Sequence, residues 1–408
     1  MENKFADRLP QIIVPKHYEL RLIPEMKDKI FSGSVEITFE KKDDSQTIPN
    51  EILLHAHDPL VIDNVSCNDF PLKFEQASNI LTIHEFQDLS QPISILFHGI
   101  INDGSSGFTY GIFTSNNILA TQFEPNYAST VFPCFDEPCI RSTFNISIVS
   151  SLSEEVFSNM PLASSRNQGT SKISEFQTTP PIPAYLVSFV IGAFDSIHSY
   201  SKSGVPIDVY GHLESCDAVL PLAIEGIDFM EEYTQIKYPL PRLQIVIVPG
   251  FVLGGMENHG LIILNHYGNT SEDYVPVVYH EIAHHWAGNL ATIKWWDSLW
   301  VPEGLATFFP FLLLEKKYEK SFQNEIISCH LQSALLKDSS PNVLPLKSCS
   351  QTESDFNVIT YYKSLLLLNS SRNWYGNDDF QKSLQIFQKK RSHFSMLLSL
   401  SLDILSPY

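Results

Sequence analysis

Cationic side chains are scarce in this sequence. It contains 27 lysines and arginines against 46 aspartates and glutamates, which gives a formal net charge of −19 at pH 7. An acidic field of this kind repels nucleic acids and anionic membrane surfaces, because both carry negative charge themselves. The charge balance therefore argues against nucleic-acid and membrane partners, and it mildly favours ligands that carry a positive charge.

Long apolar runs and cysteines are also few. No stretch reaches the length of about 18 apolar residues that a membrane span needs, and the C-terminal residues 397–405 are short and interrupted by Asp403. Residues 1–8 lack the apolar core of a secretory signal. Six cysteines in 408 residues do not form a disulfide framework, and we expect Cys134 and Cys139 to be thiols. These absences predict a cytoplasmic protein.

The chain is long enough for two domains. Apolar residues alternate with polar ones in several runs of the first half, including residues 18–22, 35–39, 93–97 and 144–148, as in half-buried strands. Turn residues follow at 102–104 and 181–183. We therefore predict an antiparallel β-sheet domain over residues 1–203 and a second, mainly helical domain over residues 204–408.

A possible metal site lies in the second domain. His280 and His284 stand at i and i+4, so a helix would turn both imidazoles to the same side. Glu303 supplies a carboxylate further along the chain, and Glu281 is placed to face a water on the metal without binding the metal. Zinc accepts two imidazoles and one carboxylate and leaves a fourth position open, as in a hydrolase. The simpler alternative is a helix with two solvated histidines.

Several further motifs carry a family resemblance. Thr-Gln-Phe-Glu-Pro stands at residues 121–125 and Phe-Pro-Cys-Phe-Asp-Glu-Pro at 132–138. Gly-Gly-Met-Glu-Asn follows a strand-like run (243–248) at residues 254–258, and Tyr-Tyr-Lys stands at 361–363 in an expected helix. In this order, the set resembles the gluzincin zinc aminopeptidases, the group of aminopeptidase N and the puromycin-sensitive enzyme. The resemblance extends to about residue 390.

The resemblance implies a fold and a metal. It implies an α+β multidomain protein, with an N-terminal saddle-shaped β domain followed by a thermolysin-like helical catalytic domain. It implies one zinc ion per chain, held by His280, His284 and Glu303. Glu281 would take a proton from the attacking water and pass it to the leaving amine. The hydroxyl of Tyr361 would donate to the oxyanion of the tetrahedral intermediate.

The resemblance also implies a peptide substrate with a free N-terminus. Glu124 and Glu257 would bind the α-amine, because two buried carboxylates require a cation. The backbone of Gly254 and Gly255 would pair with the substrate like an added strand. Met256 and Asn258 belong to the same substrate-binding motif.

Some residues depart from the family pattern. Ser129 replaces an arginine, His259 a tryptophan and Ser364 a glycine, while residues 263–265 replace a polar stretch. Pro302 replaces an asparagine; if its helix begins near Ser298, this proline lies just past the tolerated first turn, and Pro310 would kink the helix again. His285 would point about 100° away from His284, toward the substrate or into a supporting position.

Two alternatives and some properties stay open at this stage. The chain could be an inactive relative that binds a peptide or a partner protein, or it could belong to the leukotriene hydrolase branch, which opens an epoxide. The resemblance fades near residue 391, and we can place no resemblance for residues 395–408. We therefore expect an incomplete catalytic domain without the family's C-terminal helical cap, and with apolar surface left uncovered. The preferred N-terminal residue and the oligomeric state are open.

Overall fold

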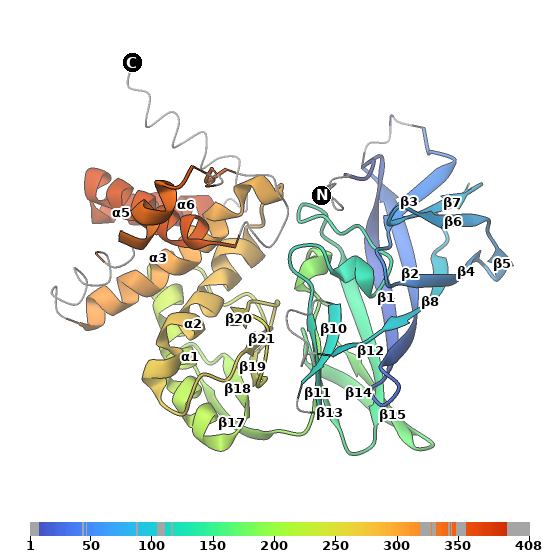
Figure 1. The fold of residues 1–408 in the computed structure, drawn as a ribbon, viewed down its shortest axis with the longest axis horizontal. Helices are drawn as coiled ribbons and strands as arrows, with labels where there is room; N and C mark the ends of the chain where they lie inside the picture. Colours follow the sequence, from blue (N-terminus) through green and yellow to red (C-terminus); the bar gives the residue numbers. More distant parts are fainter. Residues whose placement is uncertain are drawn as a thin grey trace.

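A computed structural model describes residues 8–42, 45, 47–86, 89–103, 111–115, 117–318, 328, 332–341, 343, 345–347 and 356–389. Strands β1 to β15 occupy one side of the molecule, and the helices with a further sheet occupy the other (Figure 1). The predicted order, a sheet-rich N-terminal part followed by a helical part, is confirmed. The C-terminal stretch 395–408 and Gly104 lie outside the described residues.

The largest sheet of the N-terminal part has eight strands. Their order is β14-β15-β12-β1-β2-β8-β4-β5. The strands are β1 (Ile13–Glu25), β2 (Ile30–Lys41), β4 (Val61–Cys67), β5 (Phe70–Pro71), β8 (Ile93–Ile100), β12 (Thr143–Ser151), β14 (Leu162–Gln168) and β15 (Ser171–Phe176). The predicted alternation is confirmed, since Tyr18, Leu20 and Leu22 are all buried. One pairing, β1 with β12, is parallel, because β12 returns from far along the chain and not through a hairpin.

Two smaller sheets complete the N-terminal part. One has the order β13 (Glu155–Ser158), β16 (Phe189–Gly192), β11 (Ile118–Gln122), β10 (Gly111–Ser115) and β9 (Asn102–Asp103). The other consists of β3 (Glu51–His55), β7 (Ile80–His84) and β6 (Phe74–Ala77). All five residues of β11 are buried, so its C-terminal end delivers Glu124 into the interior. Asn102 and Asp103, expected in a turn, form the short strand β9.

A fourth sheet lies in the helical part of the molecule, where two of the helices pack against it. Its order is β17 (Asp195–Tyr200), β18 (Pro206–Gly211), β19 (Leu243–Ile247), β21 (Leu261–Leu264) and β20 (Gly255–Met256). Strands β18, β19 and β21 are parallel, and helix α1 (Leu213–Thr234) makes the crossover from β18 to β19. The division at residue 203 stays a prediction; β17, on its N-terminal side, pairs with β18 on its C-terminal side.

Further helices are α2 (Ser271–His284), α3 (Trp300–Lys317), α5 (Ser364–Tyr375) and α6 (Asn377–Lys389), and residues 332–338 are also helical. Helix α2 begins with a capping box. The side chain of Thr270 accepts a hydrogen bond from the backbone N–H of Asp273, and the side chain of Asp273 accepts one from the backbone N–H of Thr270. The expected helix around residues 356–368 begins later, with the π-helical segment Ile359–Lys363 that runs into α5. Among the described residues, no helix is both long and apolar enough to cross a membrane.

One expectation about a helix boundary was wrong, and one helix end bears on the site. Helix α2 ends at His284 and is followed by the π-helical segment His285–Leu290, in which Ala287 and Gly288 have non-helical backbone angles, with φ 137° at Gly288. The expectation that was wrong concerns Pro302. Pro302 is the third residue of α3, which starts at Trp300, and so lies inside the first turn. The backbone N–H groups of that turn have no partner within the helix, so the proline removes no helical hydrogen bond there. The helix also continues past Pro310, to Lys317.

Candidate metal centre and active site

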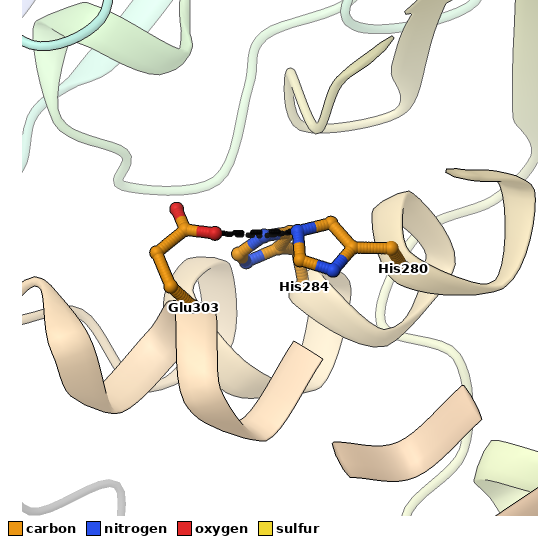
Figure 2. A group of neighbouring side chains, drawn as sticks. All are labelled: His280, His284 and Glu303. Carbon is orange, nitrogen blue, oxygen red and sulfur yellow. Dashed lines mark hydrogen bonds and ion pairs between the residues drawn. The ribbon is translucent and has the colours of Figure 1, made fainter. Parts of the chain in front are cut away.

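Helices α2 and α3 bring the three predicted metal ligands together. Figure 2 shows His280 and His284 of α2 beside the carboxylate of Glu303, which projects from α3. The two Nε2 atoms are 3.0 Å apart. Oε2 of Glu303 lies 3.2 Å from Nε2 of His280 and 3.5 Å from Nε2 of His284. A tetrahedral zinc ion with bonds of about 2.0–2.1 Å separates its ligand atoms by about 3.3 Å. The three donors therefore fit a zinc ion.

Outer contacts orient both imidazoles. Nδ1 of His284 donates to the carbonyl oxygen of Ala287 at 3.1 Å, a carbonyl that the non-helical turn after α2 aims back at the ring. The hydroxyl of Thr307 donates to the carbonyl of Glu303 at 2.7 Å and lies 3.5 Å from Nδ1 of His280. These contacts leave Nε2 of each histidine free for a metal. Neither Ala287 nor Thr307 was predicted, although Gly288 was a signal for the turn.

The electrostatics of the ligand set suit a cation. Burial alone would raise the pKa of Glu303, but the charge of His284 and hydrogen bonds from both histidines outweigh it and lower the pKa to about 2. Burial lowers the pKa of His280 below its usual value. Burial acts the same way on His284, but the charges of Glu257 and Glu303 outweigh it and raise the pKa of His284 well above its usual value. A divalent metal binds neutral imidazoles and an ionised carboxylate, so a metal bound here would displace a proton from His284.

Three more carboxylates surround this ligand set. Glu124, Glu257 and Glu281 are each 5% exposed. One carboxylate oxygen each from Glu124, Glu257 and Glu303 lies within 4.8 Å of the others, and Glu257, Glu281 and His284 form a similar group. Burial, and then the charges of neighbouring carboxylates, raise the pKa of Glu124 and Glu281, and burial raises that of Glu257. Such crowding of acidic groups favours bound cations.

The glycine-rich motif lies along the edge of the fourth sheet. Gly255 and Met256 form β20, an edge strand that pairs only with β21 in that sheet. Met256 is buried, and its sulfur accepts from the side-chain amide of Gln122 at 3.4 Å. The backbone carbonyl of Glu257 accepts from Asn289 at 2.8 Å, a contact that sequence reasoning missed. The side chain of Asn258 is buried and has no hydrogen-bond partner among the described residues.

Tyr361 faces the ligands from the π-helical segment. The centroid of its ring lies 5.8 Å from that of His280. Burial, followed by the charges of Glu303 and Glu124, raises the pKa of Tyr361 well above its usual value, so its hydroxyl keeps its proton and can donate. Ser364, which stands where the family has a glycine, packs toward Gly304. A Cβ added at Gly304 would lie only 2.4 Å from Cβ of Ser364.

One cleft of about 830 Å³ unites most of the predicted site residues. Its lining includes the three ligands together with Glu124, Gly254, Gly255, Glu257, Glu281 and Tyr361. Met256 and Asn258 are not part of the lining and lie buried behind it. The fold thus brings together a metal-ligand set, a separate carboxylate beside it, a protonated tyrosine and two further buried carboxylates.

His285 supports the site from behind. Its Nδ1 donates to the carbonyl of Glu281 at 3.2 Å, and its Nε2 accepts from the backbone of Gly260 at 3.2 Å. Burial lowers the pKa of His285 to about 4, and its ring stacks on His259 with centroids 5.8 Å apart. Because the ring is fully buried, the substrate-facing interpretation is wrong and the supporting one holds. Ser129, another departure, donates to Asp136 at 2.8 Å.

Two family models and several curated proteins match this chain. The Peptidase family M1 domain matches residues 219–399, and the Peptidase M1 N-terminal domain matches residues 14–186. Aminopeptidase M1 of Arabidopsis thaliana is 30% identical over 96% of this chain and 48% of its own length. The puromycin-sensitive aminopeptidase of Caenorhabditis elegans is 31% identical over 94% and 44%. Endoplasmic reticulum aminopeptidase 2 of Bos taurus is 28% identical over 94% and 44%.

These matches define a class of protein, the peptidases with an M1 N-terminal sheet domain and an M1 catalytic domain. The chain belongs to the peptidase M1 family, as the motifs around Glu124, Glu257 and His280 suggested. It spans about half the length of the curated relatives it matches.

Proposed function

We propose that this chain is a zinc aminopeptidase that removes N-terminal residues from peptides with a free N-terminus, with one zinc ion per chain. The proposal rests on one observation: the metal-ligand set and two extra buried carboxylates, Glu124 and Glu257, line the same cleft. A metal site alone would suit many hydrolases, whereas the extra carboxylates require a cationic group of the substrate. The relatives named as aminopeptidases support the same reaction.

The residues around the metal would share the chemistry. Held by His280, His284 and Glu303, zinc would polarise the scissile carbonyl and activate water at neutral pH. The carboxylate of Glu281 would accept a proton from the attacking water and pass it to the leaving amine. The hydroxyl of Tyr361, which keeps its proton, would donate to the developing oxyanion.

Substrate binding would use the edge strand and the two extra carboxylates. The α-amine would lie between Glu124 and Glu257, which fixes the first residue of the peptide beside the metal. The peptide backbone would pair with the half-buried sheet edge formed by β20 and the preceding Gly254, as an added strand does. Met256 and Asn258 would hold this edge in place from the buried side.

Blocking the substrate's amine tests this proposal directly. Aminoacyl fluorogenic amides of alanine, leucine and arginine should be hydrolysed, and their N-acetylated forms should lose at least about 100-fold in kcat/KM. The reason is that a buried charge left without its partner costs about 3–5 kcal/mol. Glu257→Gln should weaken hydrolysis of the free amides and narrow the difference between free and acetylated forms. Equal hydrolysis of free and acetylated amides would contradict the proposal.

A second prediction concerns Gly255. A Cβ at this position would lie 2.5 Å from Oε1 and 2.7 Å from Cδ of Glu281. Gly255→Ala should therefore displace the Glu281 carboxylate, and a displacement of about 1 Å can cost about 100-fold in rate. Zinc content, measured by elemental analysis, should stay at one per chain. Gly254→Ala is the matched comparison, because its Cβ would meet the hydroxyl of Tyr267 at 2.6 Å instead. It should lose less, and equal losses would refute the steric explanation.

The proposal also includes a cytoplasmic location and a division between the two domains at residue 203. No observation on the described residues favours the inactive relative or the epoxide hydrolase.

A further inference from the structure

The cleft continues past the metal ligands as a groove between α2 and α3. His284 lies beside Glu303, and His280 lies beside Thr307, so the two helices run in opposite directions along the cleft. The next lining residues outward are Pro276 and Val277 on α2, and Pro310, Phe311 and Leu314 on α3. We call this stretch the outer groove.

Most of the lining beyond the metal ligands is apolar, and Thr307, Asn357 and Tyr362 are its polar residues. Leu253 lines it before the glycine pair, and Phe356, Val358 and Leu365 line it from the segment around Tyr361. The carboxylates of the lining are Glu124, Glu257, Glu281 and Glu303, all gathered around the metal ligands, and the described lining contains no lysine, arginine or aspartate. A ligand therefore meets charge at the inner end of the cleft and mainly apolar side chains beyond it.

The length of the outer groove follows from the geometry of α3. At about 1.5 Å per helical residue, Thr307 lies about 6 Å and Leu314 about 16 Å from Glu303 along the helix axis. An extended peptide advances about 3.3–3.6 Å per residue. The stretch from Glu303 to Leu314 therefore accommodates about five extended residues, which are the one held at the metal and about four beyond it.

The inner end fixes the direction of the peptide. Glu124 and Glu257 are each only 5% exposed, so a peptide whose α-amine they hold cannot extend past them. Its following residues must leave along the outer groove. We propose that the outer groove binds residues two to five of the substrate and selects apolar side chains there over acidic ones. This inference rests on the proposed function, because it takes the α-amine to lie between these two carboxylates.

Two physical effects produce the selection. Apolar side chains bind more tightly in proportion to the surface that the groove removes from water. An acidic side chain gains none of this, is partly desolvated without a cation among the described lining residues, and is repelled by the carboxylates at the inner end. A difference of about tenfold or more in affinity is the range that an apolar pocket supplies.

The test compares two peptides that share an N-terminal alanine and a dye-labelled lysine tail. One carries leucine and phenylalanine at positions two to five, and the other carries glutamate and serine there. Their Kd values are measured by fluorescence anisotropy on zinc-containing Glu281→Gln protein, in which the proposed proton acceptor is removed and the groove is retained. The apolar peptide should bind at least tenfold more tightly. Equal affinities, or tighter binding of the acidic peptide, would overturn the inference.

A substitution at Leu314 tests the location of the selectivity. Leu314→Lys, introduced into the same protein, should reduce the ratio of the two Kd values at least threefold, because it replaces an apolar wall by a charge that attracts glutamate. Trp374→Lys is the matched control, since Trp374 is 84% exposed on α5 and lies outside the cleft lining. It should leave the ratio unchanged. A ratio that is the same in both variants would show that the selectivity does not arise in the groove.

Hydrolysis of the short aminoacyl amides by the wild-type protein distinguishes a failure of the proposed aminopeptidase activity from a failure of the inference about the outer groove. If the amides are hydrolysed and the Kd ratio is one, the inference about the groove fails while the proposed function stands. If no amide is hydrolysed and the apolar peptide still binds more tightly, the proposed function fails and the groove is a selective peptide-binding surface.

Discussion

Glu281→Gln should reduce kcat for aminoacyl amides by about 10²–10⁴-fold without reducing the zinc content. Glutamine keeps the shape of the side chain, but it cannot accept the proton of the attacking water or return it to the leaving amine. The carboxylate of Glu281 lies against Gly255 and in the group with Glu257 and His284, not in the ligand set of His280, His284 and Glu303. Loss of rate and loss of metal should therefore be separable.

The measurement pairs steady-state kinetics on leucine amide with elemental analysis of the purified protein. Glu272→Gln is the matched control, because Glu272 lies exposed in the first turn of the same helix and should behave like the wild type. Full activity in Glu281→Gln would mean that the observed hydrolysis comes from another enzyme. Loss of zinc would mean that Glu281 helps to hold the metal.

Glu303→Ala should abolish both zinc binding and hydrolysis. The variant removes the single carboxylate of the ligand set and leaves His280 and His284 without their anionic partner. Zinc that binds only the folded wild-type protein stabilises it by about 2.7 kcal/mol when the free ion is at 100 times its Kd. A chelator should therefore lower the Tm of the wild type and leave the Tm of Glu303→Ala unchanged.

A control on the same helix separates the loss of metal from damage to α3. Lys316→Ala removes only an exposed ion pair with Glu232 and should keep both zinc and the response to chelator. Retention of one zinc ion by Glu303→Ala would show that another carboxylate holds the metal, and Glu257 is then a candidate, because one of its carboxylate oxygens lies within 4.8 Å of one of Glu303.

Much of the fold and of the ligand set could be read from local patterns. The period of two at Tyr18, Leu20 and Leu22 predicts a strand with one buried face, because successive side chains point to opposite sides. The spacing of His280 and His284 places both rings on one helical face for the same kind of reason. Such features depend only on residues close in sequence, so the sequence determined them, together with the family to which the chain belongs.

Other features depend on how distant segments pack, and the tertiary structure decided them. Glu124 after β11 and Glu257 after β20 reach the same metal site only because the two parts of the molecule meet there. The carbonyl of Ala287 and the hydroxyl of Thr307 orient the ligands through backbone turns and helix packing that no local spacing encodes. Pro302 is harmless because α3 begins at Trp300, a boundary set by the preceding turn. Residue spacing fixes which face a side chain occupies, whereas packing fixes what that face meets.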